Sequence, residues 1–141
     1  HFKLLNDCQG HNAGDRALVA VAQALATELR PSDLLGRYGG EEFVALLDGT
    51  TPQQAMPVAT RLCRRVHRME IPSGDESMLL SISIGVAIYR DGDDVESLVE
   101  RADQAMYEAK LSGRNRVCLH ADTVPPNAPP GPRLHIVKKR E

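Results

Sequence analysis

The sequence predicts an α/β domain in which helices cover one β-sheet. Two segments, residues 13–30 and 95–113, repeat apolar residues at helical spacing. Residues 80–89 alternate apolar residues with small or polar ones, which is typical of a strand. Residues 34–48 contain two short apolar runs joined by Gly39-Gly40. This arrangement predicts a hairpin, because glycine adopts turn conformations without steric cost.

The first half of the chain leads from a loop into a helix. Residues 1–15 are short, polar and glycine-bearing, and they predict the loop. The helix over residues 13–30 is stopped by Pro31, since proline cannot continue a helix. The stripe that we expect this helix to bury consists of Leu18, Val21, Ala22, Leu25 and Leu29.

Further elements follow the hairpin. Residues 51–54 (Thr-Pro-Gln-Gln) predict a helix start, with an N-cap, a proline at the first position and glutamine three residues after the cap. Pro57 predicts a kink or a later start. Residues 71–76 are expected to form a turn before the strand over 80–89. The next helix has Gly113 as its C-cap, and residues 116–119 form a short final strand.

The predicted order is loop–α–β–β–α–β–α–β. One strand added before His1 gives βαββαβ with an extra helix, an α+β sandwich with a ferredoxin-like core. We assign residues 1–120 to this domain and residues 121–141 to a linker and tail, because five of the nine prolines lie within residues 123–132. Whether residues 134–141 pack on a neighbour or fray stays open.

Composition narrows the class of protein. The chain has 141 residues, 42% hydrophobic and 26% charged, as expected of one soluble globular domain. A net charge of −2 argues against nucleic acid, and no apolar run is long enough for a membrane span. The three cysteines (Cys8, Cys63 and Cys118) are odd in number and widely spaced, which indicates neither disulfides nor a zinc site. We therefore expect a cytoplasmic protein.

The turn of the hairpin carries two adjacent carboxylates, Glu41 and Glu42. Like charges repel, so stability alone would not favour this pair. Gly39 and Gly40 allow an anionic ligand to approach the backbone, and neighbouring carboxylates can hold a hard divalent cation. The stretch therefore predicts a metal-bound phosphate group above the hairpin. A solvent-exposed acidic turn is the alternative.

Residues 37–43 (Arg-Tyr-Gly-Gly-Glu-Glu-Phe) match the GG(D/E)EF signature, and the chain resembles diguanylate cyclases over about residues 1–120. The other matching stretches, in the family's order and spacing, are 2–7, 10–15, 83–87, 102–103 and 110–115. The resemblance implies a fold like the palm of adenylyl cyclases and polymerases. It also implies that an antiparallel homodimer condenses two GTP molecules into cyclic di-GMP and two pyrophosphates.

The resemblance makes Glu41 and Glu42 the metal-site carboxylates, and Glu41 is closest to the role of deprotonating the 3′-hydroxyl. At 4 Å, a pair of like charges costs about 4 kcal/mol at an effective dielectric of ~20. Triphosphate therefore cannot approach these carboxylates without cations. We expect two Mg²⁺ or Mn²⁺ ions in each GTP site.

Further residues match the family's substrate contacts. The loop with Phe2 and Lys3 is implied to hold phosphates through its backbone amides. Lys110 and Arg114 match residues that contact the terminal phosphates, and a spacing of four on a helix lets both point one way. The alternative for this pair is a cationic helix end that complements the helix dipole.

Asn6 and Asp15 match the positions that read the guanine base. An aspartate can accept hydrogen bonds from guanine N1–H and the exocyclic amine, and adenine lacks this arrangement of donors. Asp15 therefore disfavours a cyclase that makes a mixed adenine–guanine dinucleotide. It could otherwise be an ordinary acid in the first turn of a helix.

Residues 30–33 match the RxxD inhibitory site, since Arg30 lies nine residues before Gly39 as in the family. Arg30 suits phosphate or a guanine edge, and Asp33 suits guanine donors. Arg61 aligns with a secondary arginine of that site. The other arginines of that helix are expected to be solvated. The resemblance thus implies feedback inhibition by cyclic di-GMP.

One family ligand is absent from the sequence, a metal-binding aspartate at the end of a central strand that should precede His1. We expect the sequence to be part of a longer chain with a sensory or receiver module upstream. A relative that binds cyclic di-GMP or GTP without catalysis is the alternative function. The complete Gly-Gly-Glu-Glu turn and the pair Lys110 and Arg114 favour the enzyme.

Overall fold

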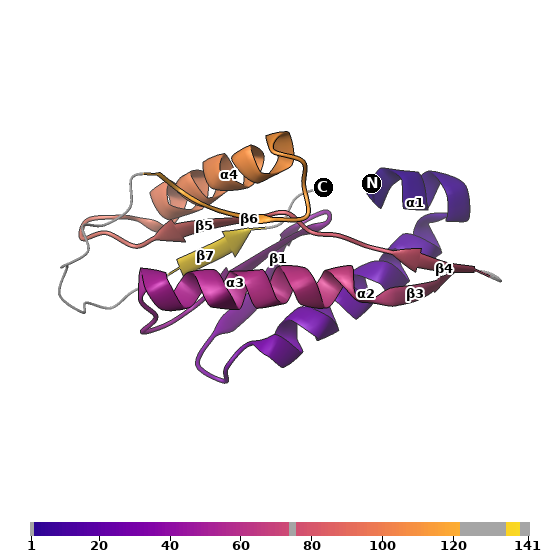
Figure 1. Cartoon of the computed structure of the whole chain (residues 1–141), viewed down its shortest axis with the longest axis horizontal. Coiled ribbons are helices and arrows are strands. Elements are labelled where there is room, and N and C mark those ends of the chain that lie inside the picture. The colour runs from indigo at the N-terminus through magenta and orange to yellow at the C-terminus, as the bar shows by residue number, and fades with distance from the viewer. Residues whose placement is uncertain (1, 74–75, 122–134, 139–141) are drawn as a thin grey trace.

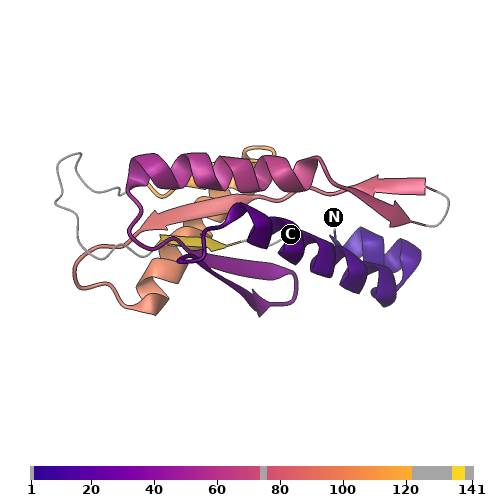
Figure 2. The ribbon, with the colours of Figure 1, turned by 90° about the horizontal axis from the view of Figure 1, so that it is seen from below.

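A computed structural model describes residues 2–73, 76–121 and 135–138. Its main sheet is covered by helices on both faces (Figure 1, Figure 2). The strand order is β1 (Leu34–Gly39), β2 (Glu42–Leu46), β7 (His135–Lys138), β5 (Ile84–Ile88) and β6 (Val117–Leu119). The helices are α1 (Phe2–Gln9), α2 (His11–Glu28), α3 (Pro52–His67) and α4 (Val95–Leu111).

Strand β5 shows how the two faces of the sheet are packed, because all five of its residues are buried. Ile84, Val86 and Ile88 belong to the core that contains the buried faces of α2 and α3. Ala87 belongs to a second cluster with Leu98 and other residues of α4. Alternate residues therefore pack against different helix layers.

Gly85 allows α4 to approach β5 closely. A Cβ atom at this position would lie 2.0 Å from the Ala102 carbonyl oxygen and 2.4 Å from the Met106 backbone nitrogen. Both are backbone atoms, so neither can move without displacing the helix. The strand is shorter than the predicted range of 80–89, because its neighbours β6 and β7 offer pairing only for a few residues.

The prediction of a loop over residues 1–15 is wrong. The segment forms α1 and the first turn of α2, and Gly10 separates the helices with a φ of 80°. Leu5 is buried and Phe2 packs against the core, so the apolar side of this short helix gains tertiary contacts that an isolated helix lacks. The next helix ends at Glu28, two residues earlier than predicted and before Pro31.

The predicted start of α3 is confirmed. The Thr51 hydroxyl accepts from Gln54 N–H and the Gln54 side chain accepts from Thr51 N–H, which forms a capping box. Pro57 lies inside the helix, so the later start is wrong. On the buried side, the Cys63 thiol donates to the Ile82 carbonyl, and burial raises the pKa of this thiol.

The predicted turn over residues 71–76 is also wrong. A separate hairpin forms there from β3 (Glu70–Ser73) and β4 (Glu76–Leu79). Ile71 pairs with Met78 across this hairpin, and both side chains pack against the core. This burial favours strand pairing over an open turn.

Strand β7 lies in the middle of the main sheet, antiparallel to β2 and β5. The sequence left the packing of this tail open, and it placed the final strand at 116–119. The structure adds a later strand at 135–138. The predicted linker over 123–132 lies outside the described residues. Within the described ranges, no helix is long and apolar enough to cross a membrane.

Candidate active site

The hairpin turn has the predicted form. Gly39 pairs with Glu42, so Gly40 and Glu41 make a two-residue connection. Gly40 has a φ of 47°, a conformation that favours glycine. The Arg37 side chain donates from Nε to the Gly40 carbonyl at 2.8 Å. This bond ties the turn to β1.

The strand register shifts between Arg37 and Gly39, which leaves Tyr38 as the extra residue of a β-bulge. A bulge increases the local twist of a hairpin and redirects the residues beyond it. The next residues on β2 alternate in burial, with Phe43 in the core and Glu42 partly exposed. The buried phenylalanine thus anchors the strand directly after the two carboxylates.

Glu41 and Glu42 are both partly exposed at this turn. Among the described residues, no group of three or more His, Cys, Asp or Glu side chains is arranged to hold a metal ion. Mg²⁺ is often bound by only one or two carboxylates, with water and substrate phosphates completing its shell. The oxygen pair at the turn fits an ion that arrives with a triphosphate.

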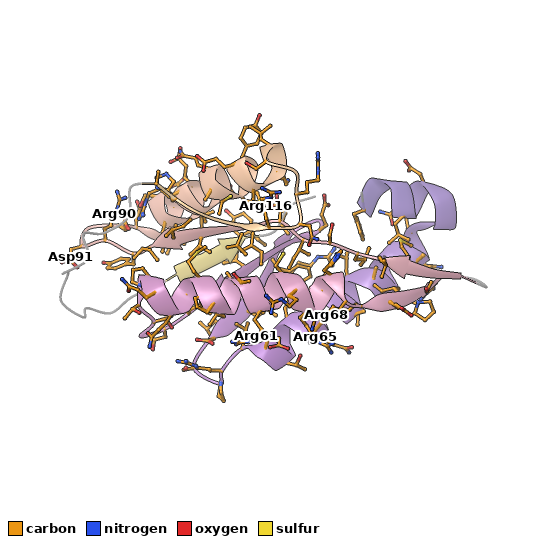
Figure 3. The ribbon with its side chains drawn as sticks, in the orientation of Figure 1. Arg61, Arg65, Arg68, Arg90, Asp91 and Arg116 are labelled. Carbon is orange, nitrogen blue, oxygen red and sulfur yellow. The ribbon has the colours of Figure 1, made fainter. Side chains whose placement is uncertain are left out.

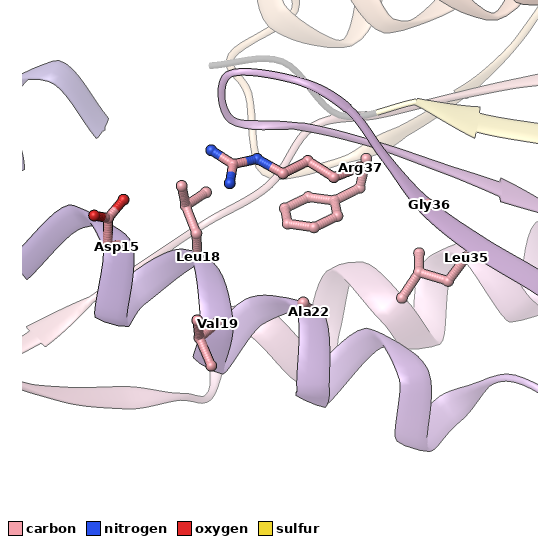
Figure 4. A pocket seen from close by; sticks show the side chains of 8 residues that line it. Asp15, Leu18, Val19, Ala22, Leu35, Gly36 and Arg37 are labelled. Carbon is pink, nitrogen blue, oxygen red and sulfur yellow. The ribbon is translucent and has the colours of Figure 1, made fainter.

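A cavity of about 520 Å³ lies between α2 and the hairpin (Figure 4). Its volume is in the range of small-molecule sites. The walls are mostly apolar, and Asp15 and Arg37 supply the charged groups. The lining residues are Asp15, Leu18, Val19, Ala22, Leu35, Gly36, Arg37 and Phe43.

The structure brings Asn6 close to the residue that precedes Asp15. Asn6 lies on α1, and its side chain contacts Gly14 on α2. Both residues implied to read the base therefore lie where α1 meets the start of α2. Phe2 is half-buried beside them, whereas the side chain of Lys3 lies outside the described part of the structure.

Lys110 and Arg114 do not share a helix, so that prediction is wrong. Helix α4 ends at Leu111, and Gly113 follows with a φ of 111°. The Arg114 N–H donates to the Ala109 carbonyl at 3.0 Å and the Gly113 N–H to Lys110 at 3.3 Å, which is a Schellman motif. This motif turns the backbone away from the helix axis.

Arg114 and Asn115 have φ values of 59° and 48°, which are uncommon for residues other than glycine. The Asn115 amide nitrogen lies 3.2 Å from His67 Nδ1 on α3, and this contact holds the turn. Lys110 lines a separate cavity of about 320 Å³ on α4. The structure thus brings Asp15, but not Lys110, to the cavity beside the hairpin.

Arg30 and Asp33 form a tight turn after α2. The Arg30 N–H donates to Asp33 Oδ2 at 2.8 Å, and the Asp33 N–H donates to the Arg30 carbonyl at 2.9 Å. Within the described residues, Asp33 Oδ1 is buried and has no hydrogen-bond partner. Arg30 itself is exposed.

Arg61 extends from α3 to the end of α2 (Figure 3). Its Nε donates to Glu28 Oε2 at 2.7 Å, and a terminal nitrogen donates to the Glu28 carbonyl at 2.7 Å. Arg65 lies 3.9 Å from the same carboxylate. Sequence reasoning missed Glu28, because no local spacing signals a partner 33 residues away.

The helix-covered sheet, the glycine hairpin and the adjoining cavity define an α/β domain with a candidate small-molecule site at the edge of its sheet. The model of the protein family described as "Diguanylate cyclase, GGDEF domain" matches residues 1–116 of the chain. The chain therefore belongs to the GGDEF domain family of diguanylate cyclases. The mixed helix and strand fold agrees with the GGDEF domains among the similar solved structures.

Named relatives support this assignment. The chain is 43% identical over 125 residues to diguanylate cyclase A of Treponema denticola, covering 88% of the chain and 34% of that relative. It is 41% identical over 119 residues to diguanylate cyclase DosC of Escherichia coli, covering 84% and 26%. The chain thus spans about a third or less of these relatives.

Two solved structures are similar as well. Diguanylate cyclase SiaD, in complex with its activator SiaC from Pseudomonas aeruginosa, has a TM-score of 0.81 and 43% identity, covering 84% of this chain and 45% of that one. The GGDEF domain of DgcB from Caulobacter crescentus, in complex with c-di-GMP, has a TM-score of 0.81 and 31% identity. This match covers 85% and 72%.

Proposed function

We propose that this chain is the catalytic domain of a diguanylate cyclase, which condenses two GTP molecules into cyclic di-GMP with release of two pyrophosphates. The observation that carries the proposal is the Glu41-Glu42 turn beside a cavity of about 520 Å³ that Asp15 lines. Relatives named as diguanylate cyclases support it.

Each half of the reaction joins a 3′-oxygen to an α-phosphorus and breaks the bond from that phosphorus to the pyrophosphate. Glu41 accepts the proton of the attacking hydroxyl. Two Mg²⁺ or Mn²⁺ ions, held by Glu41 and Glu42, supply positive charge to the phosphates when bound. Gly39 and Gly40 leave room for the phosphates at the turn.

Other side chains position the substrate. Asn6 and Asp15 select guanine through hydrogen bonds to its edge. The start of α1, with Phe2 and Lys3, together with Lys110 and Arg114, binds the phosphates. An antiparallel homodimer is required, because each chain binds one GTP and both must meet.

Arg30, Asp33 and Arg61 form an inhibitory site for cyclic di-GMP. Two features support this assignment: Asp33 Oδ1 is buried with no hydrogen-bond partner among the described residues, and Arg61 donates to the Glu28 carbonyl at the end of α2. Isothermal titration of cyclic di-GMP should show at least about tenfold weaker binding to Arg30→Ala and Asp33→Ala, since each loses a charge-assisted hydrogen bond. Affinity equal to that of the unchanged chain would remove the idea.

We further propose that residues 1–120 form the catalytic domain and residues 121–141 a linker and tail, whose strand β7 (His135–Lys138) lies in the domain's main sheet. A sensory or receiver module is proposed to precede this domain in the full-length cytoplasmic protein. The alternative is an inactive domain that binds GTP or cyclic di-GMP. Incubation of the full-length protein with GTP and Mg²⁺ separates the two, because only the enzyme releases pyrophosphate. Nucleotide binding without pyrophosphate release would favour the binding module.

A further inference from the structure

We infer that Gly14 is a positioning residue for base recognition, because it fixes where the Asn6 amide lies against the start of α2. The inference rests on the proposed function, since it concerns how the same site selects guanine. Gly14 is buried near the start of α2, directly before Asp15. Its lack of a side chain leaves the space that the Asn6 and Phe2 side chains of α1 occupy.

Any other residue at Gly14 would have to move the side chains that now contact this position. A Cβ atom there would lie 2.0 Å from Asn6 Oδ1, 3.0 Å from Asn6 Cγ and 3.0 Å from Phe2 Cζ. The first distance is far below van der Waals contact. An alanine at this position would therefore displace the Asn6 side chain.

The backbone gives no other reason for glycine. Gly14 lies inside a helix and is absent from the glycines with positive φ. Glycine in a helix interior is less stable than alanine. The structural need for glycine at this position is thus the space that Asn6 and Phe2 occupy.

The Asn6 side chain is held by packing, and its Oδ1 atom can still accept a hydrogen bond. Its Oδ1 atom is buried, with no hydrogen-bond partner in the part of the chain that the structure describes. A buried amide oxygen without a hydrogen-bond partner is unfavourable, so this atom is expected to gain a partner from a ligand. The Asp15 carboxylate, which follows Gly14 in the chain and lines the cavity, makes a purine with several N–H donors, such as guanine, the fitting ligand class.

Isothermal titration with the α,β-methylene analogues of GTP and ATP in Mg²⁺ tests the inference on the full-length protein. Gly14→Ala should bind the guanosine analogue about tenfold more weakly, the equivalent of one lost hydrogen bond, and the adenosine analogue unchanged. In an Asn6→Ala background, Gly14→Ala should change guanosine binding less than twofold, because its effect passes through Asn6. Gln23→Ala, exposed on the same helix, is the matched control.

Three outcomes overturn the inference: unchanged guanosine binding by Gly14→Ala, an equal loss for both analogues, or an equal loss in both backgrounds. If Gly14→Ala fails to fold, Asn6→Ala/Gly14→Ala must regain folding, and its failure also counts against the inference. If the protein binds the guanosine analogue but forms no product from GTP, only the proposed function is contradicted. If the folded chain binds neither analogue, both the proposed function and the role of Gly14 are contradicted.

Discussion

Arg61 and Arg101 each pair with a carboxylate, but in different surroundings. Arg61 pairs with Glu28 on the surface, where its side chain is 50% exposed. Arg101 pairs with Asp93 where both side chains are 12% exposed, and it also donates to the Ile88 carbonyl at 2.8 Å. The Arg101–Asp93 pair, which joins α4 to the segment after β5, is therefore much less exposed to water than the Arg61–Glu28 pair.

We expect Arg101→Ala to lower the free energy of unfolding by about 3 kcal/mol, because the largely buried Asp93 carboxylate loses its ion-pair partner and keeps only its hydrogen bonds to Arg90 and Ser97. Arg61→Ala, the matched control, should cost no more than about 1 kcal/mol, since exposed pairs are screened by water. Urea denaturation measures both. Equal losses in the two variants would contradict this account of the pairs.

At the scale of single residues, local motifs could be predicted from the sequence, whereas contacts between distant residues could not. The Thr51 capping box and the glycine after α4 could be predicted, because their chemistry is local. The contact between Arg61 and Glu28 could not, because it depends on how two helices cross. Arg114 was placed on a helix that ends before it, since a spacing of four does not reveal a Schellman motif.

At the scale of elements, the contact between β5 and α4 depends on Gly85. Gly85→Ala should lower the free energy of unfolding by about 1–3 kcal/mol or more, because its Cβ would overlap backbone atoms of α4. Gly36→Ala is the control for stability, since no atom lies within 4 Å of a Cβ there. Thermal melting compares them, and a Gly85→Ala variant as stable as Gly36→Ala would refute the tight packing.

The N-terminus of α4 has a pH-dependent cap. The Ser97 backbone N–H donates to Asp94 at 2.8 Å, and this hydrogen bond holds the pKa of Asp94 below its usual value. A lowered pKa in the folded state means that the carboxylate stabilises the fold above the ordinary aspartate pKa. That contribution is lost as the pH falls through the lowered value, below about 4.

We therefore expect Asp94→Ala to lower the melting temperature by a few degrees at pH 7, with the difference shrinking below about pH 4. Asp94→Asn should retain most of the stability at pH 7, because asparagine also caps helices, and should lack this pH dependence. Melting curves from pH 3 to 7 measure the effect. A constant difference between the chain and Asp94→Ala across this range would exclude the charged cap.

Elements were predicted best where their pattern was long or their turn chemistry specific. Helices α2, α3 and α4 and the β1–β2 hairpin were predicted, whereas α1 and the β3–β4 hairpin were not. The missed elements are short and depend on tertiary contacts of Leu5 and Ile71 for their stability. Local propensity alone does not contain that information.

At the scale of the whole molecule, the sheet order could not be derived from the sequence. Nothing in residues 135–138 indicates that they pair with both β2 and β5. The form of the hairpin turn was predicted more fully, because the glycines and acids of one hairpin specify a turn and its charge together. The cavity between α2 and the hairpin, which Asp15 lines, is a feature that the sequence did not indicate.

Mass-spectrometric measurement of cyclic di-GMP formed from GTP and Mg²⁺ tests the central claim most directly. The full-length protein should form the dinucleotide, and its Glu41→Gln/Glu42→Gln variant should form it at least about a hundredfold more slowly, since it loses the oxygen charges that hold the cations. Glu100→Gln, exposed on α4, should match the unchanged protein. Equal rates with and without the two turn carboxylates, or no product from the unchanged protein, would contradict the account.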